Sequence, residues 1–226
     1  MTDTAPEQLF WQVIEILDNK GLLPHVLVIG SWAEYLYHDY FEGEFTPNIR
    51  THDLDFVIRN IRKPANPVSL APYLRAQGFL HDVDRVSGVN KFFYEGGFEV
   101  EFLAPAYGVG ERYIKVPSLD IISQSIRNLS ILLRNPIVVT SHGYELITPE
   151  PAAYILQKVL INQERKGYKQ QKDAQSLEWL CQYIAEKPSE VERLQAVFAD
   201  SLSKKQQRSA LHEWERLQLP DLLVVR

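Results

Sequence analysis

The sequence predicts an α+β fold, in which a mixed β-sheet flanked by helices is followed by a helical C-terminal part. Two observations support this fold class. Between residues 26 and 58, an apolar run, a segment with helical spacing and a second apolar run follow one another. After Thr148, only helical periodicity remains. We therefore predict an α/β domain over residues 1–147 and a helical domain over residues 148–226.

The composition is that of a folded protein. Of the 226 residues, 45% are hydrophobic and 23% are charged, which allows a sizeable core. A net charge of −5 argues against non-specific coating of nucleic acid. The only cysteine, Cys181, excludes an intrachain disulfide and a cysteine-based zinc site, as is typical of a reducing compartment. The N-terminus lacks the pattern of a signal peptide and no apolar run approaches the length of a membrane span, so we expect a cytoplasmic protein.

The first predicted element is an amphipathic helix over residues 6–20. Its apolar side chains recur at helical spacing, Pro6 suits the first turn and Gly21 suits the stop. The next three elements are a buried strand, a helix that starts at Ser31 and a second strand, over residues 26–30, 31–40 and 53–58. This order places the end of one strand beside the start of a helix.

The middle of the chain predicts shorter elements. A short helix is expected over residues 71–78, and a hairpin over residues 91–105 that turns at Gly96 and Gly97. Residues 104–136 have uncertain boundaries, but residues 118–134 have helical character. A second hairpin is expected over residues 137–147, before the helices of the C-terminal part.

Two pairs of carboxylates stand out in the predicted strands. In a strand, residues two apart point to the same face about 7 Å apart, so Asp53 and Asp55 project together. Glu99 and Glu101 do the same in the second arm of the first hairpin. Mg²⁺ is typically held by one or two carboxylates together with substrate phosphates, and a third carboxylate allows two ions about 4 Å apart. The alternative is a solvent-facing strand decorated with acids.

Two further features bear on this site. Asp82 and Asp84 have the same spacing, but no apolar strand surrounds them, so we expect loop acids there. Gly30 and Ser31 stand where a strand passes into a helix. A glycine lets the backbone approach a ligand, and the first helical turn presents a positive dipole end to phosphate oxygens. A structural reading, in which Ser31 only caps the helix, is also open.

Taken together, these segments resemble the nucleotidyltransferase superfamily, the fold of polymerase β, aminoglycoside nucleotidyltransferases and AbiEii-type toxins. That pattern is hydrophobic-Gly-Ser, a helix, Asp-hydrophobic-Asp in a strand and a third acid in a later strand. The chain contains VIGSWAEYL, RTHDLDFVI and FEVEFLAP in that order. The helical segment ITPEPAAYILQKVLINQER, followed by KGYKQQKDAQSL, is similar to the AbiEii-like pattern. The resemblance covers roughly residues 26–180.

Two positions depart from the family pattern. The third acid is a glutamate rather than the commoner aspartate, and Glu99 and Glu101 compete for the role. We favour Glu101, because the following FLAP resembles the end of the family's strand. Ser176 stands where the late helical pattern of the AbiEii-like members has its second aspartate.

The resemblance implies an Mg²⁺-dependent enzyme, with two ions, that moves a nucleoside monophosphate from an NTP to an acceptor hydroxyl. Asp53, Asp55 and Glu101 would be the metal ligands, and these residues with Glu99 the catalytic set. The acceptor is left open among a small molecule, a tRNA and a protein. The alternative is a non-catalytic nucleotide-binding protein, or a toxin–antitoxin component, of the same fold.

The nucleotide itself would be bound by residues outside the acidic set. Gly30 and Ser31 would receive phosphate oxygens. Arg50, Lys158 and Lys172 would neutralise the triphosphate. The two lysines belong to a basic cluster in the helical part that is also compatible with a solvated helix face. Asp173, within the same cluster, is expected to pair with a neighbouring base rather than bind metal.

Overall fold

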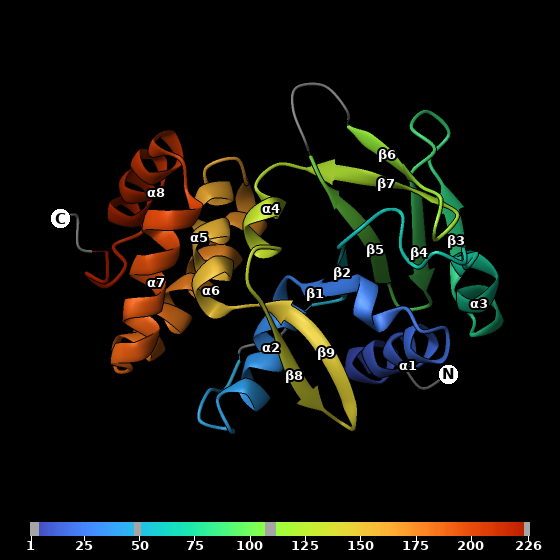
Figure 1. Cartoon of the computed structure of the whole chain (residues 1–226), viewed down its shortest axis with the longest axis horizontal. Helices are drawn as coiled ribbons and strands as arrows, with labels where there is room; N and C mark the ends of the chain where they lie inside the picture. Colours follow the sequence, from blue (N-terminus) through green and yellow to red (C-terminus); the bar gives the residue numbers. More distant parts are fainter. Residues whose placement is uncertain (1–4, 48–50, 107–111, 224–226) are drawn as a thin grey trace. The chain divides into compact units, whose positions relative to one another are not determined.

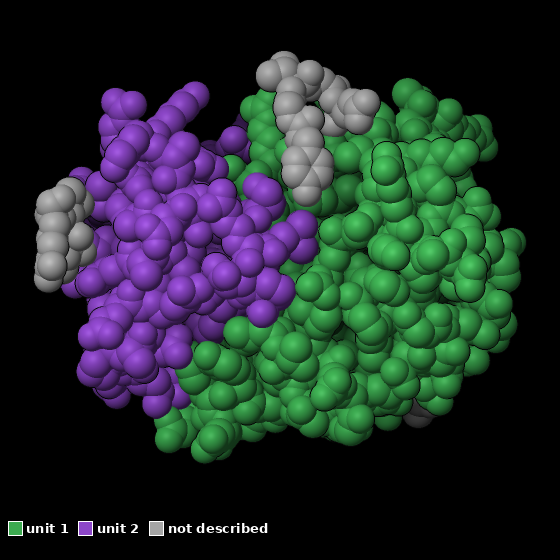
Figure 2. Space-filling model, in the orientation of Figure 1, with its two compact units in different colours: residues 1–129, 137–148 green, residues 130–136, 149–226 purple. Residues whose placement is uncertain are grey.

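The structure is a computed structural model that describes residues 5–47, 51–106 and 112–223 (Figure 1). The chain forms two compact units (Figure 2). Unit 1 comprises Met1–Leu129 and Ile137–Thr148, and unit 2 comprises Ser130–Pro136 and Pro149–Arg226. The division at Thr148 lies next to the predicted domain boundary, while the short excursion of residues 130–136 into unit 2 was not expected. The assignment of a separate functional domain to each unit stays a prediction.

Unit 1 contains a mixed sheet of seven strands. In chain order they are β1 (Val26–Ile29), β2 (Asp53–Ile58), β3 (Leu80–Val83), β4 (Asn90–Tyr94), β5 (Phe98–Pro105), β6 (Tyr113–Val116) and β7 (Ile121–Ile126). The main path runs β1-β2-β5-β4-β3, and β7 pairs with both β5 and β6 (Figure 1). The pairs β2–β5 and β5–β7 are parallel, whereas the other pairs are antiparallel. The mixed sheet confirms the predicted fold class.

Helices cover one face of this sheet. They are α1 (Pro6–Asn19), α2 (Ser31–Tyr40) and α3 (Leu70–Ala76), with a short 3₁₀ turn η1 (Leu23–His25) before β1. Their apolar sides share one core with β1, β2, β4 and β5. Within it, the rings of Phe10 and Trp32 stack at 4.4 Å between centroids and those of Phe56 and Phe102 at 5.1 Å. Because this face is filled by apolar side chains, polar residues of β2 and β5 are confined to the other face.

A second sheet follows the mixed sheet along the chain, after a short helix that lies mostly in unit 2. The strands β8 (Pro136–Ser141) and β9 (Tyr144–Pro149) form a separate two-stranded sheet, as predicted for the second hairpin. The short helix α4 (Leu129–Leu132) precedes them. The hydroxyl of Thr148 donates a hydrogen bond of 3.0 Å to the carbonyl oxygen of Val28. This buried contact fixes the end of β9 to strand β1.

Unit 2 is helical, as the periodicity after Thr148 predicts. Its helices are α5 (Pro151–Asn162), α6 (Gly167–Ala185), α7 (Pro188–Ser201) and α8 (Lys204–Arg216). Helix α5 contacts each of the other three and is buried along almost its whole length. The buried carboxylate of Glu150 receives two hydrogen bonds from Arg193, of 2.5 and 2.9 Å. Cys181 is buried in this unit, and burial raises its pKa.

Most of the expected elements are confirmed, but residues 118–134 are a correction. The predicted helical segment instead contains strand β7 and the four-residue helix α4. Ile121, Ile122 and Ile126 are β-branched, which favours strands, and Ile121 and Ser123 are buried as alternation requires. Every helix in the described part of the chain is too short or too polar to cross a membrane.

Candidate functional site

The four predicted acids come together on one face of the sheet. Strands β2 and β5 are parallel, and their register sets Asp53 opposite Glu99 and Asp55 opposite Glu101. Neighbouring strands lie about 4.8 Å apart, so these backbone positions are adjacent. Their intervening residues, including Leu54, point to the helix-covered face and are buried. The alternation predicted for these two strands is therefore confirmed.

Gly30 brings the start of helix α2 to this acidic row. Register sets Ile29 opposite Asp55, and Gly30 follows with φ 67° and ψ −149°, a conformation that is essentially confined to glycine. A Cβ on Gly30 would lie 3.3 Å from Oδ2 of Asp55. Helix α2 then begins at Ser31, as predicted. The positive dipole end of α2 is thus next to a carboxylate of the sheet.

Lys91 is the residue of this face that sequence reasoning missed. It lies on β4 opposite Glu101, and its Nζ is 2.7 Å from Oε1 of both Glu99 and Glu101. Burial disfavours the charged ammonium, but the hydrogen bonds that it donates to Glu101 and Glu99 outweigh this effect and raise the pKa of Lys91. The lysine therefore stays protonated and bridges the two glutamates.

The turn between β4 and β5 explains why Lys91 reaches this face. Register pairs Tyr94 with Phe98, so the turn has three residues, Glu95 to Gly97, rather than two. A two-residue turn at Gly96 and Gly97 would shift the register by one residue and turn Lys91 to the opposite face. The expected hairpin is confirmed, and its turn is one residue longer than the two glycines.

The residues of this face fit a metal ion in part. Asp53 and Asp55 supply oxygen ligands of the kind that Mg²⁺ takes, at the start of a helix where phosphate oxygens are favoured. Glu99 and Glu101 are ion-paired with Lys91 instead. Among the described residues, no three His, Cys, Asp or Glu side chains are grouped so as to hold a metal ion. The metal set of Asp53, Asp55 and Glu101 stays a prediction.

None of the three basic residues predicted to bind the triphosphate is among the described residues of unit 1. Arg50 lies outside the described residues. Lys158, on α5, and Lys172, on α6, belong to unit 2. Their assignment to the triphosphate stays a prediction.

Lys158 has a structural partner within unit 2. It is 7% exposed, and its Nζ donates a hydrogen bond to Oδ1 of Asp173, which is 4% exposed. Nε of Arg165 lies 3.0 Å from the other oxygen of Asp173, an ion pair without hydrogen-bond geometry. The expectation that Asp173 pairs with a base is confirmed.

The expectation for Asp82 and Asp84 is corrected in part. Asp82 lies within strand β3, where register sets it opposite Lys91. Asp84 lies in the following turn, and its Oδ1 accepts hydrogen bonds of 2.7 and 3.0 Å from the backbone N–H groups of Ser87 and Val86. These hydrogen bonds lower the pKa of Asp84. Asp84 is a turn acid as expected, whereas Asp82 is not in a loop.

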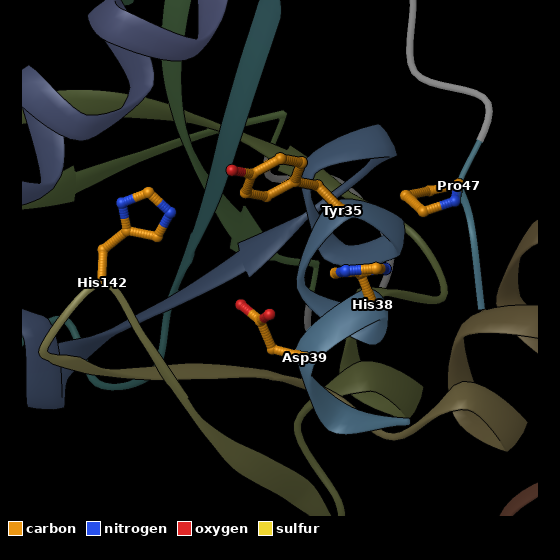
Figure 3. Close-up of a pocket in the computed structure, with 5 residues that line it drawn as sticks. All are labelled: Tyr35, His38, Asp39, Pro47 and His142. Atoms are coloured by element: carbon orange, nitrogen blue, oxygen red, sulfur yellow. The ribbon is translucent and has the colours of Figure 1, made fainter. Parts of the chain in front are cut away.

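A pocket of about 460 Å³ lies elsewhere on unit 1. Figure 3 shows its lining residues, which are Tyr35, His38, Asp39, Pro47 and His142. The hydroxyl of Tyr35 donates a 2.6 Å hydrogen bond to Glu7, and burial together with this bond raises the pKa of Tyr35 to about 12. The ring of His142 stacks on Trp11 at 4.2 Å. All five lining residues differ from those predicted for the acidic face.

Four carboxylates on one sheet face beside the start of a helix define the candidate site, and comparison with known proteins identifies the family. A family model described as "Nucleotidyltransferase" matches residues 8–200. The chain belongs to this nucleotidyltransferase family. No curated protein matches it.

Several solved structures are distantly similar. An antigenic nucleotidyltransferase-like protein from Paracoccidioides brasiliensis is 14% identical, with 92% of each chain covered and a TM-score of 0.45. The antibiotic-resistance factor ANT(2'')-Ia is 13% identical, with 92% of this chain and 96% of that chain covered and a TM-score of 0.45. A CCA-adding enzyme from Thermotoga maritima is 13% identical, with 96% of this chain and 52% of that chain covered and a TM-score of 0.29. Likenesses this weak carry no inference about substrate.

We expect Gly30→Ala to lower the free energy of unfolding by about 2–3 kcal/mol, because the new Cβ combines backbone strain with a contact at the Asp55 carboxylate. Gly21→Ala is the matched control, since Gly21 has φ +64° but no atom within 4 Å of an added Cβ. It should cost about 1–2 kcal/mol from strain alone. Urea denaturation of both variants measures the difference, and equal losses would show that the Asp55 contact is unimportant.

We expect Lys158→Ala to lower the free energy of unfolding by about 3 kcal/mol, because among the described residues it leaves the buried Asp173 paired with the part-exposed Arg165 alone. Lys205→Ala, at an exposed position of α8, should change it by no more than about 0.5 kcal/mol. Thermal and chemical denaturation compare the two. A Lys158 variant as stable as the control would argue that this lysine is retained for a ligand rather than for the fold.

Proposed function

We propose that the protein is an Mg²⁺-dependent nucleotidyltransferase that moves a nucleoside monophosphate from an NTP to an acceptor hydroxyl. The observation that carries the proposal is the placement of Asp53 and Asp55 on one sheet face directly beside the Gly30–Ser31 start of helix α2. Membership of the nucleotidyltransferase family supports it.

Each part of this face has a role in the proposal. Asp53 and Asp55 would hold Mg²⁺, which offsets the charge of the triphosphate when it is bound. Ser31 and the first turn of α2 would take phosphate oxygens, and Gly30 leaves room for them because it has no side chain. The chemistry asks mainly for positioning and charge neutralisation, which these groups can provide.

The transfer itself balances without a covalent enzyme intermediate. The acceptor oxygen bonds to the α-phosphorus, the bond to the β-phosphate oxygen breaks, and pyrophosphate leaves. The hydroxyl proton passes to a carboxylate of the sheet face, for which Glu101 is our candidate and Glu99 the alternative. The acceptor can be a small molecule, a tRNA or a protein, since each carries a suitable hydroxyl.

The second candidate function is a non-catalytic nucleotide-binding protein or a toxin–antitoxin component of the same fold. The ion pairs between Lys91 and both glutamates favour it, because they engage the carboxylates from which a third metal ligand would come. Under this alternative, nucleotide would bind without turnover.

Incubation with Mg²⁺ and each labelled NTP tests the proposal. The wild-type protein should release pyrophosphate and label an acceptor, either added or itself. The double variant Asp53→Asn/Asp55→Asn should lose activity by at least about 10³-fold, because loss of electrostatic groups at a phosphoryl-transfer site costs several kcal/mol in the barrier. Pyrophosphate release is the measurement.

The variant Glu15→Gln/Asp18→Asn is the control for loss of two carboxylates, since both residues are exposed on helix α1. It should retain full activity. Full activity in the Asp53/Asp55 variant would reject the metal assignment. Binding of Mg²⁺ and NTP to the wild-type protein without pyrophosphate release, over a panel of small-molecule, RNA and protein acceptors, would support the non-catalytic alternative.

A further inference from the structure

The acidic face is asymmetric across the sheet. Register sets Ile29, Asp55, Glu101 and Lys91 side by side on strands β1, β2, β5 and β4. The aspartates border the start of helix α2, where a Cβ on Gly30 would touch Asp55. The glutamates border Lys91 on the other side. The four carboxylates therefore divide into an aspartate half beside the helix and a glutamate half beside an ammonium group.

Lys91 is well held in this position. Its Nζ contacts Oε1 of Glu99 and Oε1 of Glu101, each at 2.7 Å. Its side chain is 36% exposed and those of the two glutamates are 23% and 22% exposed, so the contacts are only partly screened by water. Asp82 is the other register neighbour of Lys91, yet both ion pairs join it to the glutamates. A single ammonium thus serves two carboxylates at once.

This arrangement limits the number of metal ions. An ion bound by Glu99 and Glu101 would lie beside the Lys91 ammonium, and two positive charges at contact distance repel strongly where water is partly excluded. The glutamates can accept an ion only if Lys91 leaves them. Asp53 and Asp55 are one strand further from Lys91, so an ion on them would lie away from this ammonium.

We propose that the ammonium of Lys91 takes the place of a second divalent cation, so that the face binds one ion, on Asp53 and Asp55. This inference rests on the proposed function and replaces the two-ion expectation drawn from the family resemblance. Lys91 acts as a positioning residue, which holds Glu99 and Glu101 and supplies a fixed positive charge on their side of the site.

The test counts bound Mn²⁺ by electron paramagnetic resonance, with Mn²⁺ alone as the probe and the full-length protein. Wild-type protein should bind one ion, and the double variant Asp53→Asn/Asp55→Asn should bind none. Lys91→Met should bind two, because the freed glutamates become available as ligands. Lys91→Arg keeps the positive charge and should bind one.

Lys115→Met is the matched control. It removes the same charge from another strand of the same sheet, where register sets Lys115 opposite Ile122. It should bind one ion, as wild type does. Circular dichroism melting curves establish that each variant is folded, and Lys91→Gln provides a second neutral variant if Lys91→Met is not.

The outcomes separate this inference from the proposed function. Two ions in the wild type, or one ion in both neutral Lys91 variants, would overturn the role of Lys91 and leave the nucleotidyltransferase proposal standing. No ion in the wild type, or a count unchanged by Asp53→Asn/Asp55→Asn, would reject the metal assignment on which both rest.

Discussion

The parallel register of β2 against β5 is the constraint on which the rest of the candidate site depends. It aligns four carboxylates, which repel one another by about 1–4 kcal/mol per pair at 4 Å, depending on how far water screens them. The opposite face offsets this repulsion, because Leu54, Phe56, Val100 and Phe102 are buried there. Each such side chain contributes about 1.5–3 kcal/mol. Packing of the core thus fixes the register of β2 against β5, and the register sets the positions of the four acids.

The two aspartates and the two glutamates of the acidic face have different neighbours. The resemblance implies three metal ligands, Asp53, Asp55 and Glu101. The contacts instead join Glu99 and Glu101 to Lys91, and Asp53 and Asp55 lie on the side of helix α2. A phosphate-bearing substrate would then meet a helix end and a metal on one side and an ammonium on the other. Electrostatic stabilisation of this kind needs the charges to be held in place before the substrate arrives. A lysine anchored by two carboxylates meets that requirement without the entry of a free ion.

Much of this was predictable from local patterns. The Asp-x-Asp strand, the Gly-Ser helix start and the late helices follow from periodicities of two and 3.6 residues, which a sequence shows directly. Strand β7 was missed because Ile121 and its neighbours form an apolar run that fits either period. The partners of Lys158 and Lys91 could not be read off, since one depends on how two helices pack and the other on the length of a turn. The sequence shows which residues carry charge, but pairing is a property of tertiary structure.

The placement of the three-residue turn at Glu95–Gly97 has a consequence for the charge of the acidic face. If the turn instead closed on the two residues Gly96 and Gly97, with Glu95 in the strand, the buried Phe92 would come opposite Glu101 and Lys91 would pass into the apolar interior. All four acids would keep their places in the sequence, but Glu99 and Glu101 would lose Lys91 as their counter-ion. The charge balance of the acidic face therefore depends on where a surface turn closes, which a list of candidate ligand residues does not show.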